Sequence, residues 1–184
     1  MGFLKSIFGG KSKKDGQAPA AAPAASPATA APKQPTPQVI CPVVGEAIDI
    51  AEVNDPAFAS KAMGDGIAIK PAEGKLVAPI AGTVVALFPT GHACAIAGEN
   101  GISVMLHVGI DTVQMEGRGF TLHVAQGDRV ELGQPLVDFD LDAIAEAGFE
   151  STTMVLVAEA TCPGTLHKCA FGPVGAGERV LWFE

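Results

Sequence analysis

The sequence lacks the short motifs that mark several large classes of enzyme. It contains no Gly-x-x-x-x-Gly-Lys-Ser/Thr phosphate-binding loop, no Gly-x-Ser-x-Gly nucleophile motif and no Cys-x-x-Cys pair. These absences argue against nucleotide hydrolysis, serine-hydrolase chemistry and zinc ribbons. Cys162 and Cys169 flank His167, but their spacing matches no standard zinc site, so we interpret them as ordinary thiols.

Positive charge is also scarce in this chain. It has 12 Lys and Arg residues against 20 Asp and Glu residues, which gives a formal net charge of −8. Five of the basic residues precede residue 39, so the rest of the chain carries seven basic and 19 acidic side chains. A surface of this sign repels phosphate backbones, which argues against a nucleic-acid partner. It favours partners that are themselves basic.

Neither a secretory signal nor a membrane span is indicated. The first ten residues lack a long apolar run followed by a small-residue cleavage site. Residues 76–98 carry no charge over 23 positions, but their internal prolines and glycines argue against a bilayer helix. We therefore expect a cytoplasmic protein with reduced thiols at its four cysteines.

Residues 1–16 form a candidate amphipathic arm. Phe3, Leu4, Ile7 and Phe8 fall on one stripe of a helix, and lysines follow at positions 11, 13 and 14. One hypothesis is reversible binding to the anionic inner face of the membrane, and the alternative is a frayed chain end. Residues 17–38 contain nine alanines and six prolines, which is typical of an extended flexible linker.

Residues 39–184 are predicted to be all-β, because β-branched runs alternate with glycine and proline. Many short strands favour a β-sandwich or distorted antiparallel barrel over βαβ units. Residues 78–85 and 127–136 both resemble turns of the barrel-sandwich hybrid fold, which indicates a duplicated architecture. One helix is expected at 141–147, with Asp140 as its cap. The expected strands are 48–50, 67–69, 76–78, 83–88, 93–97, 102–107, 120–124, 135–139, 154–157 and 179–183.

Two of the four histidines occupy positions suited to chemistry. His107 ends an apolar segment just before a turn, and His92 begins the preceding segment. If these segments pair through a turn centred between residues 99 and 100, His92 lies directly opposite His107 on the same face. Both rings could then contact one phosphoryl group or one metal ion, and a neutral imidazole can attack phosphorus near pH 7. The alternative is a pair of core histidines without a chemical role.

Six segments of the chain carry a recognisable order and spacing of residues. They are 64–71, 77–84, the Thr90/His92 stretch, 107–113, 116–120 and 174–180. Together they resemble the glucose-type enzyme IIA family of the bacterial phosphoenolpyruvate-dependent sugar phosphotransferase system, and the resemblance extends from about Ile40 to the C-terminus. Gly91 and Cys94 depart from the family pattern, which usually has Asn or a similar residue and a large residue there, and Gly91 is expected to loosen the approach to His92.

The resemblance implies a phosphotransferase component that accepts a phosphoryl group on His107 from the phosphocarrier protein HPr. The same resemblance implies that the protein then passes this phosphoryl group to a sugar-specific enzyme IIB, of glucose or N-acetylglucosamine type, within a IICB permease. The family pattern assigns His92 as the second active-site histidine, Thr90 as the hydroxyl that orients it, and Asp65 and Asp111 as carboxylates that meet partner arginines. No cofactor is required, although some members hold Zn²⁺ between the residues matching His92 and His107. Some also regulate permeases, catabolic kinases or adenylate cyclase.

A zinc endopeptidase of the LytM type is the main alternative. Its His-x-Gly-x-Asp half-site matches residues 107–111 and would make His107 and Asp111 metal ligands. Its second half-site, His-x-His, is absent from the chain. Biotinyl and lipoyl carriers form a third class, but neither Met-Lys-Met nor Asp-Lys-Ala occurs.

Overall fold

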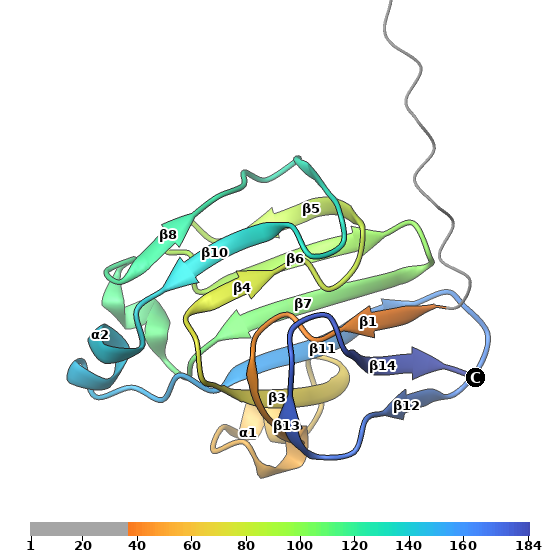
Figure 1. Cartoon of the computed structure of the whole chain (residues 1–184), viewed down its shortest axis with the longest axis horizontal. Helices are drawn as coiled ribbons and strands as arrows, with labels where there is room; N and C mark the ends of the chain where they lie inside the picture. Colours follow the sequence, from red (N-terminus) through yellow and green to blue (C-terminus); the bar gives the residue numbers. More distant parts are fainter. Residues whose placement is uncertain (1–36) are drawn as a thin grey trace, which may run out of the picture. The chain divides into compact units, whose positions relative to one another are not determined.

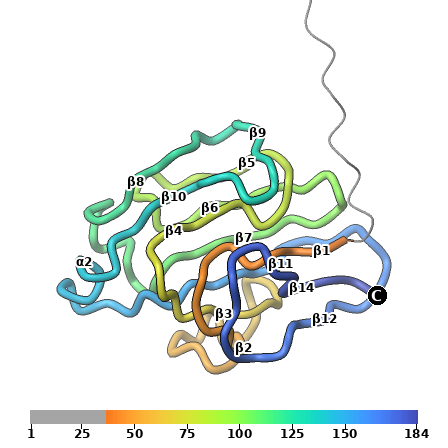
Figure 2. Tube along the Cα trace, viewed as in Figure 1, coloured from red at the N-terminus to blue at the C-terminus, as the bar shows by residue number. Residues whose placement is uncertain are grey.

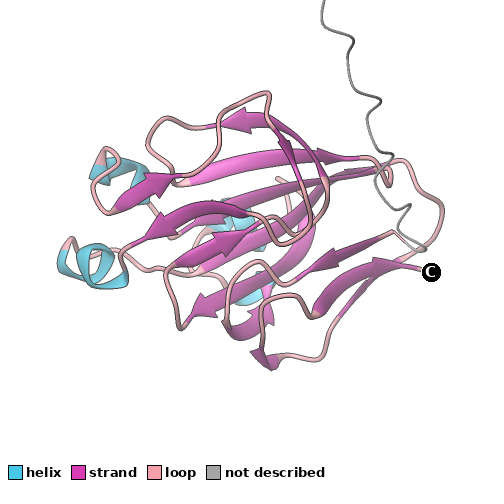
Figure 3. Cartoon of the chain, turned by 45° about the horizontal axis from the view of Figure 1, so that its top comes forward, coloured by secondary structure: helices cyan, strands magenta, loops and turns pink. Residues whose placement is uncertain are grey.

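The computed structural model describes residues 37–184. The predicted arm (1–16) and the predicted linker up to residue 36 lie outside the described residues. The first strand begins at Gln38, the last residue assigned to the linker. Within the described part the chain forms 14 strands, two α-helices and two 3₁₀ segments, which confirms the expected all-β class with short helices (Figure 3).

An antiparallel sheet of eight strands is the largest element of the fold (Figure 1). Its central strands are the longest, and each is hydrogen-bonded to neighbours on both sides. In spatial order the sheet contains β13 (Gly172–Val174), β2 (Gly45–Asp49), β3 (Asp65–Pro71), β11 (Thr153–Ala160), β7 (Ile102–Val108), β6 (Ala93–Gly98), β5 (Gly82–Leu87) and β9 (Arg129–Val130).

Two smaller antiparallel sheets complete the sandwich. The first is β4 (Lys75–Val77), β10 (Pro135–Phe139) and β8 (Phe120–Leu122), and it lies in front of β5, β6 and β7 in Figure 1. The second is β1 (Gln38–Ile40), β14 (Arg179–Phe183) and β12 (Leu166–Lys168). The two segments that resemble turns of the barrel-sandwich hybrid fold, residues 78–85 and 127–136, lie side by side, because β5 pairs with β9 (Figure 2).

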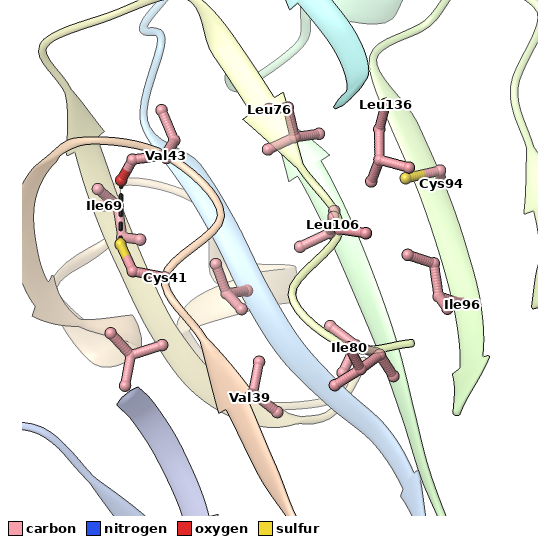
Figure 4. Close-up of a cluster of buried hydrophobic side chains, with 14 of the residues drawn as sticks. Val39, Cys41, Val43, Ile69, Leu76, Ile80, Cys94, Ile96, Leu106 and Leu136 are labelled. Carbon is pink, nitrogen blue, oxygen red and sulfur yellow. Dashed lines mark hydrogen bonds between the residues drawn. The ribbon is translucent and has the colours of Figure 1, made fainter. Parts of the chain in front are cut away.

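The main hydrophobic core lies between the large sheet and the smaller ones. Leu106 and Ile96 of the large sheet lie close to Leu76 of β4 and Leu136 of β10 (Figure 4). Along β7 every second residue is buried in this core, as the two-residue period of a strand requires. His107 therefore belongs to the opposite face of β7, together with Met105.

A second, smaller core covers part of that opposite face. Its buried members are Ile50, Val53, Phe58, Ala68, Met154 and Leu156. Phe58 belongs to α1 (Pro56–Ala59), and Ile50 begins the 3₁₀ segment η1 (Ile50–Glu52). Phe58 of this small core packs against the ring of His107.

All ten predicted strands are present, but several of their boundaries are wrong. Strand β2 ends at Asp49, because the Asp49 carboxylate accepts a hydrogen bond from the Ala51 N–H and starts η1. β8 ends at Leu122 rather than residue 124. The helix α2 (Leu141–Glu146) is capped by Asp140 as predicted, and ends one residue early. The missed elements are β1, β9, β12, β13, α1, η1 and η2 (Thr112–Met115).

The described helices are short. None of the helices in residues 37–184 has both the length and the apolar composition that a bilayer span requires.

Candidate functional site

The site is centred on His107, near the end of β7. Its backbone pairs with Ala93 of β6 on one side and with Met154 of β11 on the other. The imidazole is half-buried, and the edge of the Phe58 ring packs against it with 5.0 Å between ring centroids. Strand pairing and the Phe58 contact therefore position His107, while its half-buried ring stays partly open to solvent.

His92 lies directly beside His107, but not through the predicted register. The strands pair Ala93 with His107, one residue away from the expected pairing of His92 with His107. A one-residue shift within a regular strand would send the side chain to the other face. The His92 side chain nevertheless lies beside His107, because His92 precedes the regular strand β6 and directly follows Gly91, whose φ of +74° turns the chain. The rings meet with 5.1 Å between centroids and an interplanar angle of 77°.

Hydrogen bonds occupy the Nδ1 atoms of both rings. His107 Nδ1 lies 2.9 Å from the carbonyl oxygen of Gly109, and His92 Nδ1 lies 2.6 Å from the hydroxyl of Thr90. A carbonyl oxygen can only accept, so the proton of a neutral His107 resides on Nδ1. The Nε2 atom of His107 therefore carries the free lone pair.

Both histidines are held in the neutral form at pH 7. Burial lowers the pKa of His107 to about 4, and repulsion from His92 contributes to the same shift. Burial also lowers the pKa of His92, whose side chain is only 5% exposed. Neutral imidazole is the nucleophilic form, so this environment keeps His107 in the protonation state that a nucleophile requires.

The carboxylates near His107 are Asp111 and Asp55. Asp111 is exposed, adopts φ of 59° at the start of η2, and makes no side-chain capping bond. Asp55 caps α1 through a 2.7 Å bond from the Ala57 N–H. Both carboxylates raise the pKa of His107, a smaller effect than burial, so their charge acts on the imidazole.

The structure does not bring Asp65 to the histidines. Ala68 of β3 pairs with Met154, which pairs with His107, so Ala68 is level with the site. Asp65 lies three residues farther along the strand, roughly 10 Å away at the usual rise per residue. Its carboxylate already accepts bonds from Lys61 at 3.0 Å and Lys168 at 2.7 Å.

Sequence reasoning missed three neighbours of the histidine pair. These are Asp55, Phe58 and Phe88. The ring centroid of Phe88 lies 5.1 Å from that of His92, and Phe88 is 51% exposed. The pair Asp55-Pro56 has the pattern of a helix start, which could have revealed α1. Nothing in the sequence places that helix next to His107, which lies 52 residues after Asp55.

The residues present can supply only part of a metal site. No group of three or more His, Cys, Asp or Glu side chains within residues 37–184 is arranged to hold an ion. The adjacent rings of His92 and His107 would supply two nitrogen ligands at most, so further ligands would have to come from another molecule. The endopeptidase alternative needs a complete set of ligands around His107 and Asp111, which these residues do not provide.

Comparison with known proteins gives a consistent result. Residues 37–162 match the family model described as "phosphoenolpyruvate-dependent sugar phosphotransferase system, EIIA 1". A glucose-specific EIIA component from Halalkalibacterium halodurans is 43% identical over 143 residues, which cover 78% of this chain and 83% of that protein. An N-acetylglucosamine-specific EIICBA component from Klebsiella pneumoniae is 39% identical over 174 residues.

Coverage differs between the two relatives. The second match includes 90% of this chain but only 27% of the Klebsiella protein, so the chain spans about a quarter of that relative. The solved structure of glucose permease IIA from Mycoplasma capricolum superposes with a TM-score of 0.74 at 34% identity, and covers 78% of this chain and 93% of that one. These matches overturn the endopeptidase alternative.

Proposed function

The chain belongs to the EIIA 1 family of the phosphoenolpyruvate-dependent sugar phosphotransferase system, and from this premise we propose that His107 carries the phosphoryl group. As a glucose-type EIIA domain, the protein is a phosphotransferase component. The observation that supports His107 is the bond from its Nδ1 to the Gly109 carbonyl, since it leaves the lone pair on Nε2. A pKa of about 4 keeps that lone pair free of a proton at pH 7.

The reaction is a transfer between two imidazole nitrogens. Nε2 of His107 attacks the phosphorus of the donor's phosphohistidine, a new P–N bond forms, and the donor's P–N bond breaks. The donor nitrogen recovers its lone pair, and the proton on Nδ1 of His107 stays in place. Such a reaction depends mostly on alignment and on stabilisation of the charged phosphoryl oxygens.

His92 is suited to provide that stabilisation. If the Thr90 hydroxyl donates to Nδ1 of His92, the proton of the neutral ring resides on Nε2. His92 Nε2–H can then donate to a phosphoryl oxygen held on His107. The role of Thr90 is to select this tautomer, and its 2.6 Å contact supports the assignment.

The partners we propose are HPr as donor and an enzyme IIB domain as acceptor. A relative whose name combines EIIC, EIIB and EIIA supports the link to EIIB. The charges of Asp55 and Asp111 and the exposed side chains of Phe88 and Val113 form a surface suited to basic, partly apolar partners. Relatives specific for glucose and for N-acetylglucosamine place these two sugars among the candidates. We place this exchange in the cytoplasm.

Three further proposals concern metal, membrane and regulation. A Zn²⁺ ion could be held by Nε2 of His92 and His107 with ligands from a target protein, and would crosslink the two proteins. The arm at 1–16 would tether the domain to anionic membrane. Permeases, catabolic kinases and adenylate cyclase are the regulatory targets that the family resemblance implies.

The test of the central proposal is a labelling experiment. Incubation with labelled phosphoenolpyruvate, enzyme I and HPr should produce an acid-labile, base-stable phosphate on this protein. His107→Gln should abolish the label, whereas His123→Gln, a matched change at a histidine paired with Asp138, should keep it. Label that persists in His107→Gln would exclude His107 as the acceptor.

A further inference from the structure

The carbonyl of Gly109 decides which nitrogen of His107 carries the proton, so its orientation is important. Two backbone bonds from the loop after β7 to the segment before β11 hold this residue. The Gly109 N–H donates to the Thr152 carbonyl at 3.0 Å, and the Ile110 N–H donates to the Glu150 carbonyl at 2.9 Å. These bonds fix one end of each peptide group that flanks Gly109.

Thr112 holds the carbonyl end of the peptide group between Val108 and Gly109. Its hydroxyl donates to the Val108 carbonyl at 2.5 Å, and this carbonyl belongs to the peptide group just before Gly109. The Thr112 side chain is fully buried. Its methyl group also packs onto Gly109, since a Cβ added to that glycine would lie 2.3 Å from Cγ2 of Thr112. Gly109 has φ of +76°, a conformation that favours glycine, and the Thr112 side chain packs directly against it.

We propose that Thr112 is a positioning residue for phosphotransfer, which aligns the Gly109 carbonyl and so keeps the proton on Nδ1 of His107. The inference rests on the proposed role of His107. Thr112 touches neither the phosphoryl group nor the reacting nitrogen, and it acts through the Val108–Gly109 peptide group. Without this restraint the Nδ1–H bond to Gly109 weakens, and the proton spends more time on Nε2. An imidazole that is protonated on Nε2 has its lone pair on Nδ1, next to the Gly109 carbonyl, so its Nε2 cannot attack phosphorus.

The experiment compares Thr112→Val with Thr112→Ser in the full chain. Valine keeps the shape but loses the hydroxyl, whereas serine keeps the hydroxyl and loses the methyl group. Thr153→Val is the matched control, because it removes another fully buried hydroxyl, which bonds the Ser151 carbonyl at 3.2 Å. Thr112→Ala is a second variant without the hydroxyl, for use where valine prevents folding.

Two measurements are made on each protein. Nitrogen NMR of the unphosphorylated protein reports the tautomer of His107, and rapid-quench labelling gives the rate of phosphoryl acceptance from phospho-HPr. We expect Thr112→Val to move His107 toward the Nε2–H tautomer. The acceptance rate should fall about three- to tenfold, the usual worth of one hydrogen bond. Thr112→Ser and Thr153→Val should retain the wild-type tautomer and rate within about twofold.

The outcomes separate this inference from the proposed function. An unchanged tautomer in Thr112→Val, or an equal shift in Thr112→Val and Thr153→Val, would overturn the role of Thr112. Absence of label on the wild-type protein would overturn the proposed function instead. The tautomer measurement needs no phosphoryl donor, so it tests Thr112 in either case.

Discussion

Protonation of His107 should make the folded protein sensitive to mild acid. The pKa of His107 is about 4 in the folded protein, whereas a histidine in an unfolded chain has a pKa of about 6.5. Above pH 6.5 the ring is neutral in both states, so its titration does not affect stability. As pH falls from 6.5 toward 4, the unfolded chain binds a proton that the folded protein does not bind. The free energy of unfolding therefore decreases over this interval.

The expected size follows from the two pKa values. A gap between about 4 and about 6.5 corresponds to roughly 3 kcal/mol in full, at 1.36 kcal/mol for each pH unit. Integration between pH 7 and pH 4.5 gives about 2 kcal/mol of lost stability from this one residue. The loss arises from moving a charged imidazole out of water, toward His92 and the ring of Phe58.

The assay is urea unfolding of the wild type and His107→Gln at pH 7 and at pH 4.5. Both proteins keep His92 and the same carboxylates, so their other pH effects cancel to first approximation in the difference between the two. The stability of the wild type should fall by about 2 kcal/mol more than that of His107→Gln. Equal losses in the two proteins would show that His107 titrates normally, and would refute the explanation of its reactivity by burial.

Three further predictions concern neighbouring residues and the arm. His92→Gln should still accept phosphate from phospho-HPr but pass it to IIB at least about tenfold more slowly, as expected for loss of a charge-assisted hydrogen bond; normal transfer in a quench-flow assay would contradict this role. Asp65→Asn should lower the free energy of unfolding by about 1 kcal/mol through loss of its contacts to Lys61 and Lys168, whereas Asp111→Asn should raise the KM for phospho-HPr. A raised KM in Asp65→Asn with unchanged stability would instead support a partner-binding role for Asp65. Deletion of residues 2–16 should leave phosphotransfer in solution unchanged and reduce cosedimentation with anionic vesicles; equal cosedimentation with and without the arm would count against the tether.

Local patterns predicted the elements of this fold well. The β-branched runs marked all of the longer strands, because alternate burial of such residues is a property of a few adjacent positions. Asp140 followed by an apolar helical turn marked α2, since capping also depends on near neighbours. The missed strands β1, β9, β12 and β13 have two or three residues each, so they carry little or no alternation pattern; β4 and β8 are equally short but were predicted.

The candidate site was predicted less evenly. The short motif around His107 already contains Gly109 and Asp111, so the bond that orients its ring arises within three residues. The pairing of the two histidines was predicted from a hairpin register that proved to be one residue off. The rings meet because the turn at Gly91 places His92 outside the regular strand, and the dihedral angles of such a turn are not apparent from the sequence.

What the sequence by itself determined is the family, the all-β architecture and the two histidines of the candidate site, because each of these depends on residue types at fixed spacing along the chain. Only the tertiary structure decided which carboxylates face the site. It packs α1, and with it Asp55 and Phe58, beside His107, and it commits Asp65 to Lys61 and Lys168. The reason is that these contacts join segments far apart in the chain, and their geometry is set by how the sheet and the small core pack together.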